Sequence, residues 1–322
     1  MRDRVRMSAR DDARSFLPTP ALLEAYAHTL ATLGDTPGVR GIDIGILPAT
    51  PATPASVASV ASVAPALAVR VHRFAAARQH ASWAARSGAM GRHDVRCIRP
   101  GLPIGARGSA AGTLGLLVFD DTHAYALSCA HVLDAGDAPS RAVLQPPGTS
   151  RRAEHVVIGV HAASLLDHRG DAAIARLDTD RPACLEQGGG AREVLVGVRR
   201  ARVGDIVTKC GATSGETVGV VDGIGRYWLG DGQPGHDGFR VVPRSAPRER
   251  HDLSLGGDSG AVWYVRGERL GVGLHVGAEL PGEPDDFAIA CHLDVVLAAF
   301  GVHPTPAPTT TLRLGCRGSA PA

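Results

Sequence analysis

The rhythm of hydrophobic and polar positions changes along the chain. Between Pro20 and Leu33 the leucines fall on one helical face and Gly34 follows, so the spacing predicts a helix. Residues 66–74 alternate apolar with polar side chains, which predicts a half-buried strand. The other elements expected in the first hundred residues are strands over 39–47 and 93–98 and an alanine-rich helix over 75–86.

From Gly108 onward the pattern becomes short apolar runs separated by turn residues, with little helical periodicity. The runs are 112–119, 124–129, 155–160, 172–177, 193–198, 206–209, 217–221, 239–242, 261–265, 270–276 and 287–290. Many short strands at this spacing are typical of an all-β barrel or sandwich. A short closing helix is expected over 294–300, where Gly301 ends it.

These differences in sequence pattern divide the chain into four parts. We expect a polar tail over 1–18, a small α+β N-terminal domain over 19–100, a β-rich domain over 101–302 and a tail rich in proline and threonine over 303–322. Within the first domain, residues 48–65 repeat Ala-Ser-Val without charges or aromatic anchors, which favours a flexible surface loop.

Composition and charge exclude several classes of function. The chain has 322 residues, 44% of them hydrophobic, and a formal net charge of +2, so it carries no nucleic-acid or membrane signature. Apolar runs are too short for a membrane helix, and the charged N-terminus is unlike a secretory signal, so we expect a cytoplasmic protein. The six cysteines show no CxxC spacing, so we expect no metal site. Without an export signal, we expect them to be mostly reduced thiols, and we expect no cofactor.

One glycine-rich stretch carries candidate chemistry. Gly256-Gly257-Asp258-Ser259-Gly260 places a hydroxyl in a tight turn just before an apolar run. A serine hydroxyl becomes a good nucleophile only when a base takes its proton and amide donors hold the resulting oxyanion. If Ser259 is a nucleophile, the chain should also contain a histidine to act as its base and a carboxylate to orient that histidine.

Two other stretches in the β-rich part supply those groups. His131 follows a predicted strand and small residues, and Asp171 stands at the start of another apolar strand. Taken singly, each residue also fits a structural role: a glycine turn around Ser259, a core histidine, or an aspartate that begins a strand. The joint pattern of three suitable residue types in the order His, Asp, Ser favours catalysis.

That order, with Gly257-Asp258-Ser259-Gly260, resembles the chymotrypsin/trypsin-fold serine peptidases over residues 108–301. Further stretches resemble the plant narrow-leaf-type trypsin-like peptidases and their bacterial relatives: 112–115, 127–133, 143–146, 171–176, 211–219 and 271–275. The resemblance implies a mainly β, two-barrel trypsin-like peptidase domain over 101–302, preceded by the small N-terminal domain.

The resemblance also implies roles for particular residues. Ser259 would attack a peptide carbonyl, His131 would take its proton and Asp171 would orient the imidazole. The amides of Gly257 and Ser259 would form the oxyanion hole, with Asp258 as structural support.

The implied substrate-binding residues are Leu253, Leu274, His275 and Val276. Since position 253 is not a carboxylate, we expect an apolar or small specificity pocket. No Ile-Val-Gly-Gly activation site precedes the first barrel, so Asp258 needs a partner other than a freed N-terminal ammonium, or none.

The function expected from these observations is a serine endopeptidase that acts on protein or peptide substrates through an acyl-enzyme. The alternative is a binding or scaffold module of the same fold without turnover. An esterase of the α/β-hydrolase type ranks third, because the G-x-S-x-G elbow is absent around Ser259. The sequence leaves homo-oligomerisation open.

Overall fold

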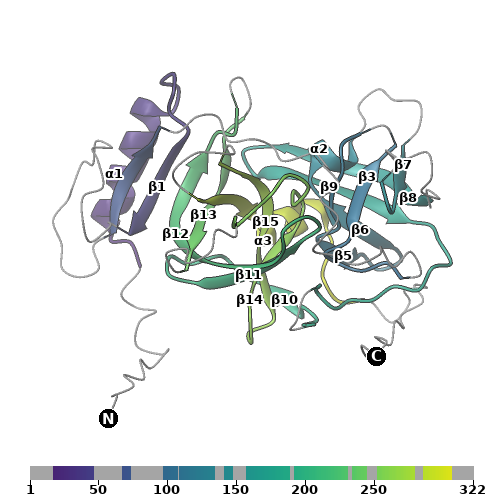
Figure 1. Ribbon diagram of the computed structural model, residues 1–322. Helices are drawn as coiled ribbons and strands as arrows, with labels where there is room; N and C mark the ends of the chain where they lie inside the picture. The colour runs from purple at the N-terminus through teal and green to yellow at the C-terminus, as the bar shows by residue number, and fades with distance from the viewer. Residues whose placement is uncertain are drawn as a thin grey trace, which may run out of the picture.

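The structure is a computed structural model that describes residues 17–46, 67–73, 97–107, 109–134, 141–147, 157–188, 192–230, 234–244, 252–279 and 286–306. In this part of the chain the fold is mainly β, with two sheets and few helices (Figure 1). The predicted loop 48–65, the predicted helix 75–86 and most of the predicted strand 93–98 lie outside the described residues.

The C-terminal half forms a closed six-stranded barrel. Its strands are β11 (Ile206–Gly211), β12 (Gly215–Tyr227), β13 (His236–Pro243), β14 (Val262–Val265), β15 (Leu270–Ala278) and β16 (Ala288–His292). They follow the order β11-β14-β15-β16-β13-β12, and pairing between β11 and β12 closes the ring. The short strand β10 (Gly197–Val198) runs parallel to β15. Helix α3 (Leu293–Phe300) follows β16 and ends at Gly301, whose φ is 66°.

The preceding residues form a curled half-barrel sheet. It contains β3 (Pro103–Ala106), β4 (Gly112–Thr113), β5 (Leu116–Phe119), β6 (Ala124–Ser128), β7 (Ala142–Leu144), β8 (Val157–Asp167) and β9 (Gly170–Leu177), in the order β4-β3-β7-β8-β9-β6-β5. The one-turn helix α2 (Ala130–Leu133) follows β6. The two-barrel expectation is confirmed, but β3 and β7 were not predicted as strands.

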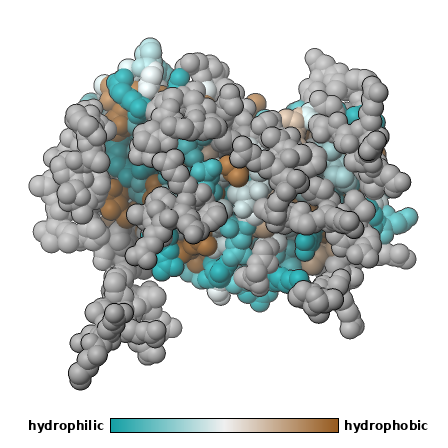
Figure 2. Space-filling view, viewed as in Figure 1, coloured by the Kyte–Doolittle hydropathy of each residue, from teal (hydrophilic) through white to brown (hydrophobic). Residues whose placement is uncertain are grey.

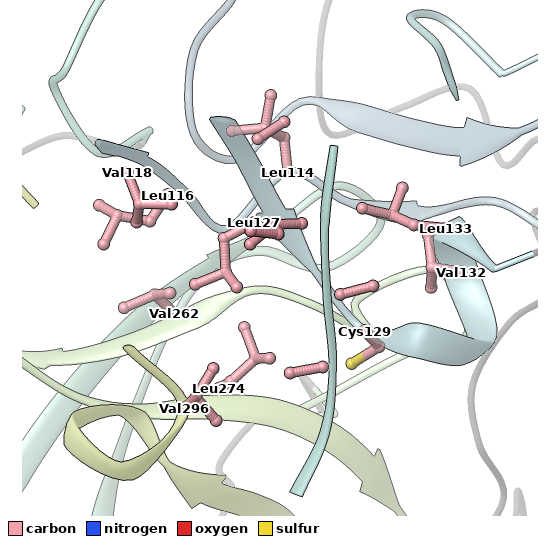
Figure 3. Close-up of a cluster of buried hydrophobic side chains, with 14 of the residues drawn as sticks. Leu114, Leu116, Val118, Leu127, Cys129, Val132, Leu133, Val262, Leu274 and Val296 are labelled. Atoms are coloured by element: carbon pink, nitrogen blue, oxygen red, sulfur yellow. The ribbon is translucent and has the colours of Figure 1, made fainter. Parts of the chain in front are cut away.

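The two barrels share one hydrophobic core. Leu127 and Cys129 from the first barrel lie in the same buried cluster as Val262 and Leu274 from the second (Figure 3). A second cluster fills the C-terminal barrel around Trp263. The active-site candidates therefore sit on elements that are fixed by packing between the barrels.

The N-terminal elements extend the C-terminal barrel (left in Figure 1). Strand β1 (Gly41–Ile46) pairs antiparallel with β12, and β2 (Leu67–His72) pairs with β1, so both continue the sheet. Helix α1 (Pro20–Leu33) has the predicted bounds, with Thr19 as its N-cap and Pro20 at its first turn. It packs on this hairpin over a small third core. Whether residues 19–100 form a domain of their own stays a prediction.

A buried carboxylate ties the hairpin to the barrel. Asp43 in β1 is fully buried and receives two hydrogen bonds of 2.7 Å from the guanidinium of Arg70 in β2. Tyr227 in β12 donates its hydroxyl to the same carboxylate at 2.7 Å. Burial alone would raise the pKa of Asp43, but His72 and Arg70 lower it below the usual range.

Two remaining predictions concern the cysteines and the membrane. Cys129, Cys184, Cys210 and Cys291 carry free thiols, whereas Cys97 is disulfide-bonded. Among the described residues, no helix combines the length and the apolar character that crossing a bilayer requires.

Candidate active site

The sheet register brings His131 and Asp171 together. Strand β6 ends just before the helix that carries His131. Asp171 is the second residue of the neighbouring strand β9, and Ser128 of β6 pairs with Ala173 of β9. His131 Nδ1–H donates to Asp171 Oδ2 at 2.5 Å, and the other carboxylate oxygen accepts the backbone N–H of Ala130 at 2.7 Å. Asp171 thus caps the start of α2 while holding one imidazole tautomer.

The environment keeps Asp171 ionised. Its side chain is fully buried, and burial alone would raise its pKa. The neighbouring His131 outweighs this effect through charge and hydrogen bonding, so the pKa of Asp171 lies below its usual value. The carboxylate can therefore stabilise a positive charge on the imidazole.

Ser259 lies in the turn before β14, and this turn is tied directly to the first barrel. Thr113 N–H donates to the Ser259 carbonyl at 2.7 Å, and Thr113 Oγ1 donates to the Gly257 carbonyl at 2.8 Å. A Cβ atom at Gly112 would lie 2.5 Å from Val132 Cγ2 and 2.7 Å from the Ser259 carbonyl oxygen. The glycine therefore lets both the helix that carries His131 and the Ser259 turn approach this point of the chain closely.

The two atoms that the sequence predicts to react are buried and have unsatisfied hydrogen-bonding capacity. Within the described residues, neither Ser259 Oγ nor His131 Nε2 has a hydrogen-bond partner, although both atoms are shielded from solvent. Unpaired buried polar atoms are costly and are found mainly at functional sites. Nε2 is also the nitrogen that remains for proton transfer once Nδ1 is bonded to Asp171.

The predicted oxyanion donors lie in the same turn. Gly257 has a φ of 103°, which favours glycine, and Gly260 has a φ of 92°. Within the described chain, the N–H groups of Gly257 and Ser259 donate no hydrogen bond, whereas the N–H groups of Asp258 and Gly260 on either side of Ser259 are bonded to Leu255 and His275. The turn thus leaves two neighbouring amide donors available for a ligand oxygen.

Asp258 has a buried lysine as its partner. Lys209 Nζ lies 2.7 Å from Asp258 Oδ2, and both side chains are fully buried. The other carboxylate oxygen accepts the backbone N–H groups of Thr213 and Ser214, each at 3.0 Å. Burial would raise the pKa of Asp258, but Lys209 lowers it well below the usual range. Sequence reasoning missed this lysine.

The predicted substrate residues are all buried. Leu274 and Val276 belong to the core that the barrels share, and Leu253 belongs to the core of the C-terminal barrel. The His275 ring lies behind the Ser259 turn, where its Nε2 is 2.7 Å from Ser254 Oγ and its ring packs edge-on against Trp263. Substrate contacts of β15 would therefore be made mainly by its backbone.

A carboxylate binds the backbone of Leu253, and a second carboxylate lies close to the first; neither was predicted from the sequence. Asp286 accepts the Leu253 N–H at 3.1 Å, and Glu279 accepts the Phe287 N–H at 2.9 Å. Burial, with a smaller contribution from the charges of Asp286 and Asp252, raises the pKa of Glu279 to about 7. The amide bonds arise from chain segments that meet only in the fold, so no local sequence signal marked them.

One cluster has the composition of a metal site. Ligand atoms of Cys129, His131 and Asp171 lie within 4.8 Å of one another. The thiol donates to the His275 carbonyl at 3.1 Å, and burial raises its pKa well above the usual value, so it stays protonated. His131 and Asp171 are bonded to each other. Because metal ligation requires a thiolate and free lone pairs, this donor set does not fit a metal ion.

No protein-family model and no curated protein matches the chain. Several solved structures are similar to the chain. A glutamic-acid-specific serine protease described as using a histidine triad in substrate binding is 21% identical, with 65% of this chain and 100% of that chain covered at a TM-score of 0.51. An alpha-lytic protease homologue, N4, is 21% identical, covering 65% of this chain and 100% of its own, at 0.49. Protease A of Thermobifida fusca is 18% identical, covering 64% and 97%, at 0.48. The first likeness, together with the observed barrels, establishes that the chain has the two-barrel chymotrypsin fold.

Proposed function

We propose that this protein is a serine endopeptidase that hydrolyses protein or peptide bonds through Ser259, His131 and Asp171. One observation carries the proposal. Ser259 Oγ and His131 Nε2 are both buried without a hydrogen-bond partner among the described residues, while the other ring nitrogen of His131 is bonded to Asp171. The solved neighbour with a TM-score of 0.51 is named as a serine protease, which supports the proposal.

In the proposed mechanism, His131 Nε2 takes the Ser259 hydroxyl proton as Oγ attacks the carbonyl carbon, and later gives that proton to the leaving amine. Asp171 keeps Nδ1 protonated and stabilises the imidazolium. The N–H groups of Gly257 and Ser259 receive the oxyanion, and losing one such donor typically costs about a hundredfold or more in rate. Water then hydrolyses the acyl-enzyme by the same proton route.

For substrate binding, we propose that the peptide backbone adds to β15 alongside Val276. The β14 strand pairs with β15 only as far as Leu274, while β16 covers the other side as far as Ala278. An extended peptide can form strand-type hydrogen bonds on such an open edge. Leu253, Leu274 and His275 would then support the pocket and strand from behind.

A fluorophosphonate probe tests the nucleophile. We expect labelling of the wild-type chain at Ser259 and none of Ser259→Ala or His131→Ala, while Ser164→Ala, a serine on the exposed side of β8, labels normally. A peptide library then tests for cleavage. Failure of the folded chain to label would refute the catalytic proposal.

The binding-module alternative makes a different prediction from the same experiment. It expects peptides to bind without being cleaved, and a Ser259→Ala variant to bind as tightly as the wild type. The narrow-leaf-type relationship and the cytoplasmic location also remain proposals. The first is supported by the motifs of the sequence, and the disulfide at Cys97 weighs against the second.

A further inference from the structure

A cavity of about 760 Å³ lies between helix α1 and the C-terminal barrel. Its walls come from α1, β1, β12, residues 200–203, the β8–β9 turn and the β16–α3 junction. We call it the α1 pocket. It shares no lining residue with the proposed catalytic, oxyanion or substrate residues, so it is a second concave site.

Much of the pocket surface is apolar. Its apolar lining comes from Leu23, Tyr26 and Leu30 of α1, Ile44 of β1 and Ile224 of β12. Leu23 is 49% exposed although it is a large hydrophobic residue. Figure 2 shows hydrophobic (brown) residues among hydrophilic ones on the left of the visible face, where Figure 1 places α1 and its hairpin. An apolar ligand body would remove this surface from water.

The polar part of the lining is strongly basic. Arg169, Arg200, Arg202 and Arg226 line the pocket, and Asp237 is the carboxylate among the lining residues. Asp237 is already bonded to Arg226 at 2.7 and 2.9 Å. Outside the lining, Asp167 pairs with Arg169 at 2.7 Å and Asp294 with Arg200 Nε at 3.4 Å. Four guanidinium groups against three carboxylates leave one positive charge in excess, which favours an anion.

A buried histidine at the pocket has a ring nitrogen without a hydrogen-bond partner among the described residues. His292 lines the pocket and is 5% exposed, and its Nδ1 is buried with no hydrogen-bond partner among the described residues. Burial, followed by the charge of Arg200, lowers the pKa of His292 to about 3, so the ring is neutral near pH 7. A neutral ring offers one N–H donor beside a guanidinium, and these groups together match the two oxygens of a carboxylate.

We propose that the α1 pocket binds a long-chain carboxylate, with its chain against α1 and β12 and its carboxylate at Arg200 and His292. The apolar walls fit the hydrocarbon chain. The excess positive charge and the unbonded nitrogen of His292 fit the carboxylate. A fatty alcohol would lack the charge, and a fatty ammonium would be repelled by the arginines.

The pocket also borders the segment that carries Asp171. His168 and Arg169 form the turn between β8 and β9, two residues before Asp171, and the Asp237 N–H holds that turn through the His168 carbonyl at 2.7 Å. On the opposite side, Gly170 lies against Cys291, where a Cβ atom would be 2.9 Å from the sulfur. Since His292 follows Cys291, an occupant contacts both sides of this turn and restricts its opening.

Calorimetric titration of the full chain with dodecanoate, dodecanol and dodecylammonium, all as monomers below their micelle concentrations, tests the proposal. We expect saturable 1:1 binding of dodecanoate, at least about tenfold tighter than dodecanol, because a hydrogen bond to a charged group contributes that much. Arg200→Gln should lose this preference, whereas Arg107→Gln, a matched exposed arginine in the first barrel, should keep it.

His292→Phe separates a ligand role from a structural one. Removing an orphan buried nitrogen should leave the unliganded protein as stable or more stable, while dodecanoate binding weakens by about tenfold. Bound dodecanoate should also slow amide hydrogen exchange in residues 168–171 in wild-type protein. This readout does not depend on peptidase activity, so it stands even if Ser259 proves unreactive.

Three results would overturn the inference: equal affinity for dodecanoate and dodecanol, unchanged binding in both Arg200→Gln and His292→Phe, or no saturation below millimolar concentration. Selective binding of an apolar peptide in place of dodecanoate would also reject it, since the occupant would then be a peptide. Binding without any change in exchange at 168–171 would reject the link to the Asp171 segment.

Discussion

Replacing Lys209 with methionine should destabilise the protein and impair the Ser259 turn. The ion pair between Lys209 and Asp258 is 2.7 Å long and fully buried, and removing one partner of such a pair typically costs about 3–5 kcal/mol. The ammonium also lies 5.4 Å from the Trp263 ring centre, a contact worth about 1–2 kcal/mol when desolvated. Methionine keeps most of the volume, so the loss is electrostatic rather than a cavity.

Two features of the site limit that loss. Asp258 keeps the backbone N–H bonds from Thr213 and Ser214, and it can take up a proton when the lysine is gone. We therefore expect about 3–4 kcal/mol, measured by urea unfolding with tryptophan fluorescence. A typical domain is stable by about 5–15 kcal/mol, so the variant should still fold. Its fluorophosphonate labelling should fall, because the bonds that orient the turn depend on Asp258.

A double-mutant cycle supplies the control. Lys209→Met combined with Asp258→Asn removes both charges, so the double variant should be more stable than the sum of the single losses predicts, with a coupling energy of about 2 kcal/mol or more. The reasoning fails if Lys209→Met costs less than about 1 kcal/mol with normal labelling, or if the coupling is below about 0.5 kcal/mol.

Three further predictions concern other parts of the structure. Asp171→Asn should leave the fold intact but lower kcat/KM by about 10⁴-fold, because the amide favours the wrong imidazole tautomer; a normal rate for a cleavable peptide would contradict this. Asp43→Asn should cost about 3–5 kcal/mol by leaving Arg70 buried without its main partner, and unchanged urea midpoints would argue against it. Because the folded pKa of Asp43 lies below its unfolded value of 3.8, its stabilisation is present above that pH and should be lost as the pH falls further, which acid titration of unfolding measures. Gly115→Ala should disturb the contact between the barrels and slow labelling of Ser259, since its Cβ would lie 1.9 Å from the Gly260 carbonyl oxygen; wild-type labelling and stability would show that the barrels can separate freely.

The elements that could be predicted from sequence are those specified by local signals. Helix α1 has the expected bounds because Thr19, Pro20 and Gly34 mark its ends, and α3 ends at Gly301 as predicted. Strand β3 was missed because two of its 4 residues, Pro103 and Gly105, are poor strand formers, and β7 was missed because it is only 3 residues long. Their pairing comes from neighbours in the sheet and leaves little trace in the local pattern.

The candidate site was predictable where chemistry is concentrated in short motifs. The proximity of His131 to Asp171 follows from the pairing of β6 with β9, which makes the order of the motifs meaningful. Lys209 gave no such signal, because it is 49 residues from Asp258 and reads as an ordinary polar position at the end of a strand. Long-range charge pairs of this kind depend on the packed fold, and a single sequence does not reveal them.

The buried lysine leads to a prediction about activation. Where a turn like that of Ser259 depends on a freed N-terminal ammonium, blocking the N-terminus abolishes its active shape. Here Lys209 supplies an ammonium from within the chain, on β11 of the same barrel. We therefore expect equal fluorophosphonate labelling rates for the full chain with a free N-terminus, with an acetylated one and with an N-terminal peptide extension. Labelling that appears only after proteolytic trimming would show that the Lys209–Asp258 pair does not suffice to hold the turn. Labelling of Lys209→Met should fall to the same extent in all three forms, which separates loss of the ion pair from any effect of the N-terminus.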